Sequence, residues 1–498
     1  MLRRVLTPLL AACASVLALL VVGPPAHAAP VTLPTNPMDF TGTNGDPVDA
    51  HGGGMIKVGS YYYLFGENRN DDNTFKAVSV YKSSNLKTWE WVGDALNQKS
   101  DPDLEIANIE RPKVIYNDTT KKYVMWMHKE NGLSYGPGYP PATDYSQSRA
   151  AVATSDTVDG PYTYLGSFRP KKLNGEETGS RDQTLYKDED TGIAYQVTAT
   201  EGGKDLRIFQ LNADYTGYEK EVANPWAGKS REAPALFKRD GVYFMLTSGS
   251  SYWNSNQQQY ATSYSLSSGW SAMKDVGNQY GYGSQATYVQ PVQDSSGNTT
   301  SYLFMGDDWA GVSWDPKKVN DSKYVWLPLT FPNKTTMNLP WYPQVEIDTA
   351  AGTVKGVGGG TDYNLVARHS DKCVDVKDNS AADNAHVVQF DCNSGLNQQW
   401  RLENAGSGYY RILAQHSGKC LAVEDGFTDM AFVNQYNCGS GQNQQWKFED
   451  QGNGYYRLVA RHSGLCLDVQ KGSAANNARL IQFKCGTGTN QQFKRDTA

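Results

Sequence analysis

Residues 51–65 read His-Gly-Gly-Gly-Met-Ile-Lys-Val-Gly-Ser-Tyr-Tyr-Tyr-Leu-Phe. A polar position opens this stretch, a short apolar run and a Gly-Ser turn follow, and an aromatic-rich run closes it. The same order recurs four more times before Trp309. Repeats of this length that are made of strands and turns indicate a β-propeller, in which the first strand of every blade lines a central channel. The five opening positions, called slots below, are His51-Gly52, Glu110-Arg111, Asp182-Gln183, Glu232-Ala233 and Gln285-Ala286.

The rest of the chain up to residue 355 agrees with this interpretation. It contains many strand-length runs of Val, Tyr, Phe and Thr that are bounded by turn residues, and little amphipathic helix pattern. Each repeat of this part has room for the four strands of a blade. We therefore expect an all-β protein with a five-bladed propeller at residues 29–355, whose channel receives one slot from each blade.

The first 28 residues have the pattern of a secretory signal. Arg3 and Arg4 precede an apolar stretch from Val5 to Val22, and Ala26-His27-Ala28 supplies a small-residue cleavage site. A membrane anchor is the alternative interpretation, and no other apolar stretch is long enough to span a bilayer. We expect a secreted, extracellular protein.

The charge of the chain excludes some partners. It has 46 Lys and Arg residues against 52 Asp and Glu residues, and no basic run outside the signal. An acidic protein of this kind is a poor candidate for binding nucleic acid or anionic lipid. We expect neither a nucleic-acid nor a membrane partner, and we expect a monomer.

The cysteines lie almost entirely in the last quarter of the chain. Six of the seven form three evenly spaced pairs, which indicates disulfides made in an oxidising compartment. A zinc site is the competing interpretation, but the spacing lacks a Cys-x-x-Cys knuckle. The sequence leaves the connectivity open. The six are Cys373, Cys392, Cys420, Cys438, Cys466 and Cys485.

A Gly-rich hinge at residues 356–362 separates the propeller from this cysteine-rich part. After the hinge, at residues 363–498, three segments of about equal length align with one another. Each ends in Gln-x-Trp or its equivalent: Gln398/Trp400, Gln444/Trp446 and Gln491/Phe493. Each unit is too small to bury its own core, so three must pack around a pseudo-threefold axis.

This part resembles the ricin-type β-trefoil lectins, which also serve as carbohydrate-binding modules (family 13) of secreted glycosidases. The resemblance implies one sugar site per repeat, made of an Asp, an aromatic platform and an Asn. Ala422 replaces the Asp in repeat two, so we expect two competent sites and one weakened site, and we interpret the Gln-x-Trp residues as core packing. The implied sugar-binding residues are Asp375, Phe390 and Asn397 in repeat one, Tyr436 and Asn443 in repeat two, and Asp468, Phe483 and Asn490 in repeat three.

The acidic slot residues of the propeller suit glycosidic bond hydrolysis. That reaction needs a protonated acid for the leaving oxygen and a second group to activate water. Glu110, Asp182 and Glu232 stand at slots, and crowding carboxylates in a partly desolvated pocket raises the pKa of at least one of them.

The propeller segment resembles the five-bladed glycosidases of family 43. The resemblance rests on His51 to Gly59, Arg181-Asp182 and Glu232-Ala-Pro-Ala235. Those enzymes invert the anomeric centre with an Asp base, a pKa-tuning Asp and a Glu acid. The usual Asp-Pro-x-x-Ile-x-x-Gly strand would place the base at Gly52, so the expected base is absent.

One subgroup shares this departure, the exo-β-1,3-galactanases, which carry Ile-Glu-Arg-Pro-Lys in blade two and a Gln in blade five. This chain has Ile109 to Lys113 and Gly283-Ser284-Gln285. The resemblance implies Glu232 as general acid, Asp182 as the group that tunes it, and Gln285 as the holder of the attacking water and an unconventional base. Glu110 and Glu67 would contact the terminal sugar. A neutral amide is a very poor base, so Glu110 is the competing candidate for that role. Further substrate contacts are expected from Arg111, Tyr135, Tyr252 and Trp309, of which the aromatic residues fit buried packing equally well.

The sequence thus favours a secreted galactan 1,3-β-galactosidase that removes galactose from the non-reducing end of β-1,3-galactan or arabinogalactan, with the trefoil holding the polymer. No cofactor is expected to be required, and the sequence does not determine whether a structural calcium ion sits in the channel. Two alternatives remain: another family 43 glycosidase such as an arabinofuranosidase or xylosidase, and a non-catalytic carbohydrate-binding protein.

Overall fold

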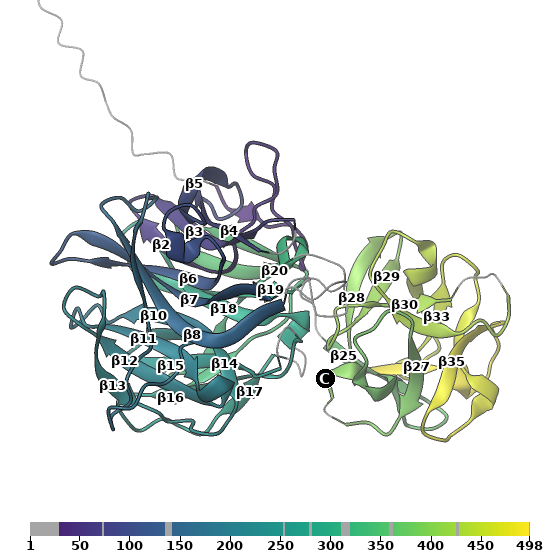
Figure 1. Ribbon diagram of the computed structural model, residues 1–498. Coiled ribbons are helices and arrows are strands. Elements are labelled where there is room, and N and C mark those ends of the chain that lie inside the picture. The colour runs from purple at the N-terminus through teal and green to yellow at the C-terminus, as the bar shows by residue number, and fades with distance from the viewer. Residues whose placement is uncertain are drawn as a thin grey trace, which may run out of the picture.

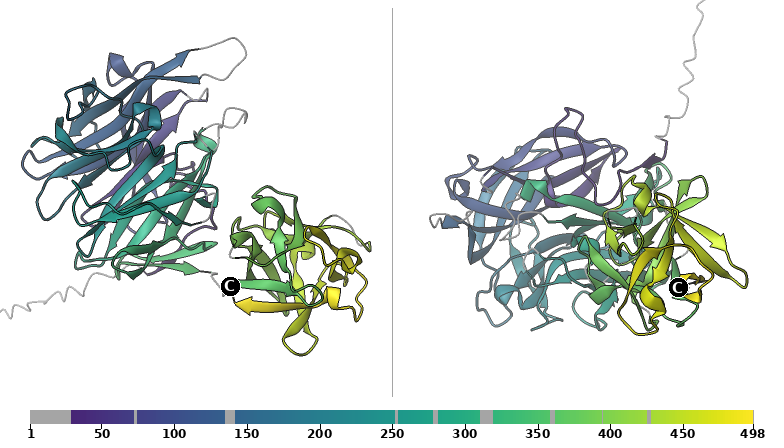
Figure 2. Two further views of the ribbon diagram at one scale, coloured as in Figure 1. Left: turned by 90° about the horizontal axis from the view of Figure 1, so that it is seen from below. Right: turned by 90° about the vertical axis from the view of Figure 1, so that its right-hand side faces the viewer.

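The computed structural model describes residues 29–71, 74–134, 142–251, 254–277, 281–309, 319–357, 362–393, 395–424 and 428–497. Two all-strand domains lie side by side, the larger one from the N-terminal part of the chain and the smaller one from the C-terminal part (Figures 1 and 2). Among the described residues, no helix has the length and apolarity needed to cross a membrane.

The larger domain contains five consecutive sheets whose strands follow chain order, four of them four-stranded and the last three-stranded. Their bounds are β2 (His51–Val58), β3 (Tyr61–Arg69), β4 (Phe75–Ser83) and β5 (Glu90–Asn97); β6 (Ala107–Asn117), β7 (Lys122–Ser134), β8 (Ala142–Ser155) and β9 (Thr163–Phe168); β10 (Gln183–Lys187), β11 (Ala194–Thr200), β12 (Asp205–Leu211) and β13 (Tyr218–Ala223); β14 (Arg231–Arg239), β15 (Val242–Gly249), β16 (Gln258–Ser263) and β17 (Lys274–Val276); β18 (Gln285–Gln293), β19 (Thr299–Asp308) and β20 (Lys323–Pro328).

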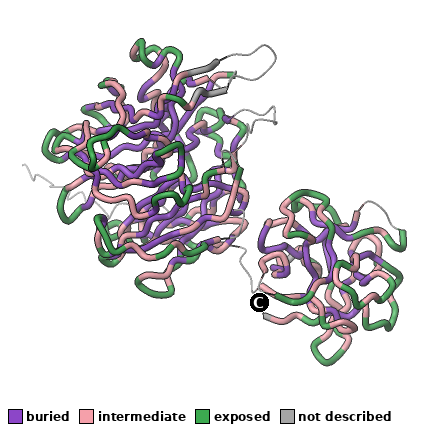
Figure 3. Tube along the Cα trace, turned by 60° about the horizontal axis from the view of Figure 1, so that its bottom comes forward, coloured by how far each residue is buried: buried purple, intermediate pink, exposed green. Residues whose placement is uncertain are grey.

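The first strands of these sheets form a closed ring. Strand β2 contacts β6, β6 contacts β10, β10 contacts β14, β14 contacts β18, and β18 contacts β2 again. Each sheet is therefore one blade, and the five-bladed propeller expected from the sequence is confirmed. Buried segments run through the interior of each domain, and exposed segments gather at the periphery (Figure 3).

The N-terminal segment closes the ring at blade five. Met38 forms a backbone bridge with Tyr324 of β20, and the Asn36 side chain bonds the backbone of Trp326 in both directions, at 2.9 and 3.1 Å. Phe40 packs against blade one through Trp89 and against blade five through Trp326, at ring centroid distances of 6.2 and 5.0 Å. Residues far apart in the chain thus join the first and last blades. The remaining strands of this domain are β1 (Val31–Thr32), β21 (Thr330–Asn333), β22 (Thr336–Asn338), β23 (Gln344–Asp348) and β24 (Thr353–Val357).

A bulge at the slot re-aims the side chains in four of the five blades. Strand pairing shifts register just after His51, Glu110, Glu232 and Ala286. In three of these bulges the next backbone position is left-handed, with φ of 63° at Gly52, 55° at Arg111 and 50° at Ala233. A left-handed residue turns the strand so that two successive side chains can face the channel.

The smaller domain forms a single continuous sheet system with three similar units. Its core contains Trp400, Trp446 and Phe493, all fully buried, as the core-packing interpretation of Gln-x-Trp predicts. The β-trefoil is confirmed. Its strands are β25 (Asp362–Ala367), β26 (Cys373–Val376), β27 (Ala385–Phe390), β28 (Gln399–Gly406), β29 (Tyr409–Ala414), β30 (Cys420–Val423), β31 (Val433–Tyr436), β32 (Trp446–Asp450), β33 (Tyr455–Ala460), β34 (Cys466–Val469), β35 (Ala478–Phe483) and β36 (Phe493–Thr497).

Three disulfides join the two cysteines of each trefoil unit, which settles the connectivity. They are Cys373–Cys392, Cys420–Cys438 and Cys466–Cys485. Between the domains, β24 still belongs to a propeller sheet and runs to Val357, and β25 of the trefoil begins at Asp362. The hinge expected at residues 356–362 is therefore strand at both of its ends.

Short 3₁₀ turns make up the helical content of the described residues. They are η1 (Pro102–Leu104), η2 (Glu201–Gly203), η3 (Gly281–Gly283), η4 (Val319–Asp321), η5 (Lys377–Asn379), η6 (Leu396–Gln398), η7 (Gln442–Gln444), η8 (Gln470–Gly472) and η9 (Thr489–Gln491).

Candidate active site

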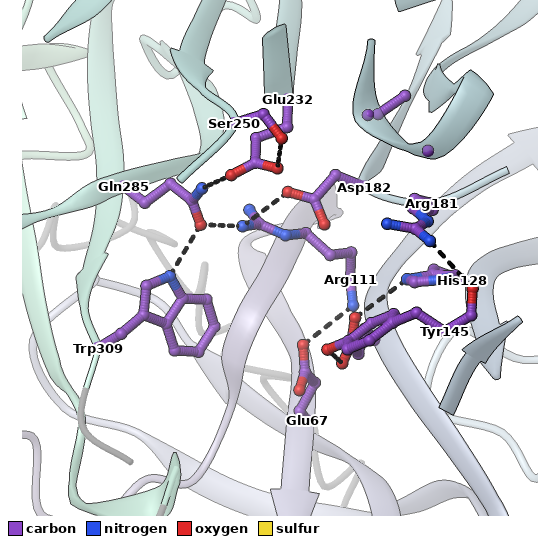
Figure 4. A pocket seen from close by; sticks show the side chains of 14 residues that line it. Glu67, Arg111, His128, Tyr145, Arg181, Asp182, Glu232, Ser250, Gln285 and Trp309 are labelled. Atoms are coloured by element: carbon purple, nitrogen blue, oxygen red, sulfur yellow. Dashed lines mark hydrogen bonds and ion pairs between the residues drawn. The ribbon is translucent and has the colours of Figure 1, made fainter. Parts of the chain in front are cut away.

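A pocket of about 230 Å³ opens where the slots converge (Figure 4). All seven predicted propeller site residues that the structure describes line it. Tyr135 and Tyr252 lie outside the described residues. The lining residues are Glu67, Glu110, Arg111, His128, Tyr145, Arg181, Asp182, Ala199, Gly202, Gly203, Glu232, Ser250, Gln285 and Trp309.

Glu232, from β14, is the carboxyl group best suited to hold a proton. Burial, and then the nearby charge of Asp182, raise its pKa to about 7. Ser250 donates to it through the hydroxyl at 3.0 Å, and the backbone N–H of Ser251 donates at 3.3 Å. Asp182 is held beside it, since its Oδ2 accepts the backbone N–H of Ala233 at 3.1 Å. A carboxyl that is half-protonated near neutral pH matches the requirement for a general acid.

Gln285, at the start of β18, has every hydrogen-bonding group of its amide engaged. Its Nε2 donates to Glu232 Oε1 at 3.1 Å and to Ser248 Oγ at 2.9 Å. Its Oε1 accepts from Trp309 Nε1 at 2.9 Å and from Arg111 Nη2. The two donors facing Oε1 determine which way the amide points, because the flipped amide would place its own N–H groups against them.

Arg111, at the slot of blade two, connects the slots of blades three and five with Glu67 of blade one. Its guanidinium lies 3.1 Å from Asp182 Oδ2 and donates to the carbonyl oxygen of Ala286 at 2.8 Å. Its backbone N–H donates to Glu67 Oε1 at 3.1 Å. Trp309 covers the guanidinium, whose central carbon lies 5.6 Å from the ring centroid. The left-handed backbone at Arg111 lets its amide and its side chain point at different blades.

Glu110 has the opposite electrostatic environment to Glu232. Burial raises its pKa, but His128, Arg69 and Tyr145 outweigh this and hold it at about 2. His128 Nδ1 lies 3.0 Å from Glu110 Oε2, and the Tyr145 hydroxyl donates at 2.8 Å. The other ring nitrogen of His128 faces Glu130 at 2.8 Å. Glu110 is therefore ionised at any pH at which the protein would work.

Gly52 is the slot position where the family would carry its base, and Glu67 takes up the space there. A Cβ built on Gly52 would collide with Glu67 Oε1 and would lie 3.4 Å from the Trp309 ring. Position 52 thus faces the pocket, whereas the neighbouring His51 is buried away from it. His51 stacks on Tyr324 at 4.6 Å. A side chain at position 52 and the carboxylate of Glu67 exclude each other.

Glu67 itself is held by the Arg69 side chain and by the backbone N–H of Arg111. Arg69 Nη2 donates to its Oε2 at 2.6 Å, and burial raises its pKa. The residue is 1% exposed. Because strand pairing places Glu67 opposite His51, its side chain emerges from the second strand of blade one, and not from a slot.

One group of described residues offers metal-ligand atoms within 4.8 Å of one another: Glu110, His128 and Asp182. Both ring nitrogens of His128 face carboxylates, and those hydrogen bonds outweigh burial and raise its pKa to about 9. A protonated imidazole is a cation and cannot ligate a metal. A metal ion would have to displace this proton to bind at the cluster.

The structure forms the sugar-site residues of trefoil repeats one and three in the same way. Asp375 Oδ2 accepts from Asn397 at 2.9 Å and from Gln398 at 2.8 Å. Asp468 repeats both bonds, with Asn490 at 2.9 Å and Gln491 at 2.8 Å. Phe390 is partly exposed and Phe483 is 39% exposed.

Repeat two lacks this arrangement. Ala422 is fully buried, and Asn443 keeps only the bond to the carbonyl oxygen of Val423, at 3.0 Å, which Asn397 and Asn490 also make to Val376 and Val469. Tyr436 keeps its partly exposed place. Repeat two therefore lacks, at position 422, the carboxylate that could accept bonds from two vicinal hydroxyls.

Sequence reasoning missed several pocket residues. His128 and Tyr145 come from β7 and β8, and Arg181 directly precedes a slot. Gly202 and Gly203 follow the second strand of blade three in η2. His128 lines the pocket and forms a His-x-Glu pair with Glu130 within β7, the second strand of blade two. That pairing is the one signal that could have pointed to them.

Comparisons with known proteins identify the family. Residues 47–293 match the model of the glycosyl hydrolases family 43. The chain is 43% identical to an exo-β-1,3-galactanase of Clostridium thermocellum, over 94% of this chain and 100% of that one, with a TM-score of 0.65. The chain belongs to glycosyl hydrolase family 43. The trefoil of this family 43 protein matches the ricin-type beta-trefoil lectin domain-like model at residues 353–436, 396–483 and 442–498.

Two further solved structures resemble this family 43 protein. A family 43 β-1,3-galactosidase with galactodeoxynojirimycin is 31% identical over 62% of this chain and 99% of that one, with a TM-score of 0.55. An exo-β-1,3-galactanase of Phanerochaete chrysosporium with galactose is 25% identical over 94% and 93%, with a TM-score of 0.58.

The fit between Gly52 and Glu67 can be tested by Gly52→Ala. We expect the activity on glycosidic substrates to fall by at least tenfold, because the new methyl group displaces the Glu67 carboxylate from the pocket. Gly59→Ala is the matched control: its φ of 60° is nearly that of Gly52, at 63°, but its Cβ would meet no atom within 4 Å. In both variants the Ala must adopt a left-handed backbone, which lowers the free energy of unfolding by about 1 kcal/mol. Urea unfolding measures this loss. Equal activities for the two variants would contradict the steric argument.

Proposed function

We propose that this protein is a secreted exo-β-1,3-galactanase that hydrolyses β-1,3-galactan from the non-reducing end with inversion. The observation that carries the proposal is Glu232, a carboxyl group with a pKa of about 7 among the ionised groups of the slot pocket. The family membership and the galactanase of C. thermocellum, which matches along its full length, support the substrate. The enzyme would bypass the side chains of arabinogalactan and so release β-1,6-branched galacto-oligosaccharides besides galactose.

In this reaction Glu232 gives its proton to the glycosidic oxygen as the C–O bond breaks. A water molecule attacks the anomeric carbon from the opposite face and loses a proton to a base. Asp182 has two tasks: its charge keeps Glu232 protonated near pH 7, and its carboxylate pairs with Arg111. Glu67, Arg111 and Trp309 supply the polar groups and the aromatic surface that a galactose ring needs.

The base is better assigned to a carboxylate than to Gln285. The amide oxygen of Gln285 already accepts from Arg111 and Trp309, and its nitrogen holds Glu232. Its chemistry is therefore to orient the acid and the attacking water. Glu110 is the carboxylate that stays ionised at every working pH, and it is the stronger proton acceptor of the two.

The remaining parts of the proposal concern location and polymer binding. Three disulfides agree with an oxidising, extracellular compartment. Repeats one and three of the trefoil would bind galactan chains through Asp375 and Asp468. The protein would act as a monomer, and its partner is the polysaccharide.

Two rival functions make different predictions. An arabinofuranosidase or xylosidase of family 43 would need its base at position 52, where Glu67 leaves no room. A non-catalytic sugar-binding protein would have no use for a carboxyl group whose pKa is raised to about 7.

Product release from three polymers decides among these functions. Incubation with β-1,3-galactan is expected to release α-galactose first, as an inverting enzyme requires, and arabinan and xylan are expected to release nothing. Glu232→Gln keeps the shape of the acid without its proton and should lower kcat by roughly 10²–10⁴-fold. Anion-exchange chromatography identifies and quantifies the released sugars, and proton NMR determines their anomeric form. Binding of galactan without any release would establish the binding protein in place of the enzyme.

The pH dependence tests Glu232 separately. A general acid must be protonated, and with a pKa of about 7 Glu232 loses its proton as the pH rises through that value. We expect kcat/KM to fall about tenfold per pH unit above pH 7. Asp182→Asn removes a charge that raises this pKa, so its alkaline limb should move to lower pH. An unchanged limb in Asp182→Asn would refute the coupling between the two groups.

Gln285→Glu distinguishes an orienting role from a basic one. The substitution keeps the size of the side chain and its acceptor for Arg111, but it turns the donor that faces Glu232 into a second carboxylate oxygen. If Gln285 orients the acid, kcat should fall, as it should in Gln285→Ala. A rate above that of the wild type would show that position 285 supplies the base, and wild-type turnover in Gln285→Ala would remove Gln285 from the mechanism altogether.

A further inference from the structure

The trefoil contacts the propeller through a buried arginine. Arg401, at the start of the second trefoil hairpin, donates from Nη1 to the carbonyl oxygen of Trp341 at 2.5 Å and lies over the Tyr342 ring at 5.7 Å. Asp362 holds the same guanidinium at 3.0 and 3.1 Å. The equivalent residues of the other repeats, Lys447 and Lys494, have side chains that are 49% and 46% exposed, against 5% for Arg401.

A glycine turn forms the second part of the contact. A Cβ built on Gly418 would lie 3.2 Å from three atoms of the Trp341 indole. Gly464 occupies the same turn in repeat three with the same φ of 69°, and no atom lies within 4 Å of its Cβ position. Repeat one has Asp371 there, with a φ of 54°. The turn itself therefore accepts an Asp, and only Trp341 makes the side chain costly at position 418.

The pseudo-threefold pattern of the trefoil is broken at this same face. We call the place where two repeats meet a corner. At the corner of repeats one and three, Arg368 stacks on Tyr455 at 4.7 Å. At the corner of repeats three and two, Arg461 stacks on Tyr409 at 4.8 Å. At the third corner the two positions are Gln415 and Asp362, which bond each other at 3.0 Å. Because position 362 is an Asp where the other repeats have a Tyr, a carboxylate is present here that pairs with Arg401. We call Asp362, Arg401, Gln415 and Gly418 the docking face.

The docking face leads to the turn that carries Gln285. Trp341 packs against Tyr282 of η3, with ring centroids 5.2 Å apart. The Tyr282 hydroxyl donates to the carbonyl oxygen of Leu339 at 2.8 Å, so the ring is held on the segment that the trefoil covers. Tyr282 has a left-handed backbone and stands three residues before Gln285. Ser284 closes the turn through its hydroxyl on the carbonyl oxygen of Gly281, at 2.7 Å.

We propose that the trefoil is docked on the propeller through this face and that docking positions Gln285 by way of Trp341 and Tyr282. The trefoil then has a second role besides polymer binding. This inference rests on the proposed function for its readout, since the effect is measured as galactose release. Tyr282 and Trp341 are positioning residues, because neither lines the pocket and both would act on Gln285 through the turn.

The test compares Gly418→Asp with Gly464→Asp in the full chain. Small-angle X-ray scattering reads the docking directly, because a detached trefoil increases the radius of gyration. Kinetics on β-1,3-galactobiose read the positioning, since a disaccharide is too short to be held by the trefoil and the pocket together. We expect Gly418→Asp to enlarge the radius and to lower kcat by roughly three- to tenfold with less change in KM, and Gly464→Asp to match the wild type in both. A second pair of variants, Arg401→Ala and its control Lys447→Ala, makes the same comparison at positions whose backbone is not left-handed.

Each outcome bears on one of the two claims. An unchanged radius in both Gly418→Asp and Arg401→Ala would show that the docking face does not hold the domains. A larger radius with unchanged kcat would show that docking does not position Gln285. If the wild type and Gly464→Asp release no galactose, the proposed function fails, and scattering still reports on the docking.

Discussion

The buried Arg111 guanidinium links its own blade two to residues of blades one, three and five. It pairs with Asp182 of blade three and donates to Gln285 and Ala286 of blade five, while its own backbone amide holds Glu67 of blade one. Carboxylates this close together and this buried repel one another unless a cation lies between them. Removing one partner of a buried pair costs about 3–5 kcal/mol because the other charge is left uncompensated. The pocket therefore depends on Arg111 more than on any one carboxylate.

The repeat made the fold and the slot residues predictable, because each blade begins with a strand that must line the channel. Glu110, Asp182, Glu232 and Gln285 could be read from it for that reason. The contacts of Glu67 with Arg111 and of His128 with Glu110 could be recognised only from the structure. Both lie on second strands, and each pairs with the residue just before the bulge of the first strand: Glu67 with His51, and His128 with Glu110. Neither the bulge nor the sign of φ at Arg111 leaves a periodic trace in the sequence.

Two glutamates at equivalent slots have opposite proton affinities. The pKa of Glu232 is raised to about 7 and that of Glu110 is lowered to about 2. Desolvation raises the pKa of both, and their partners decide the difference. Glu110 faces the protonated ring of His128, whereas Glu232 faces the carboxylate of Asp182. Chemical roles in this pocket are thus assigned by the side chains opposite each slot, and not by the residue type at the slot.

Both domains are built from repeats, and in both the informative positions are those where the repeat is broken. Among five slots, Gly52 alone faces the pocket without a side chain, and a carboxylate from the neighbouring strand fills its space. Among three trefoil corners, only one replaces the stacked Arg and Tyr by Gln415 and Asp362, and that corner meets the propeller. The unbroken repeats show what the fold itself requires at these positions. What the broken ones contain instead must therefore be explained by something outside the repeat, a substrate in one case and a neighbouring domain in the other.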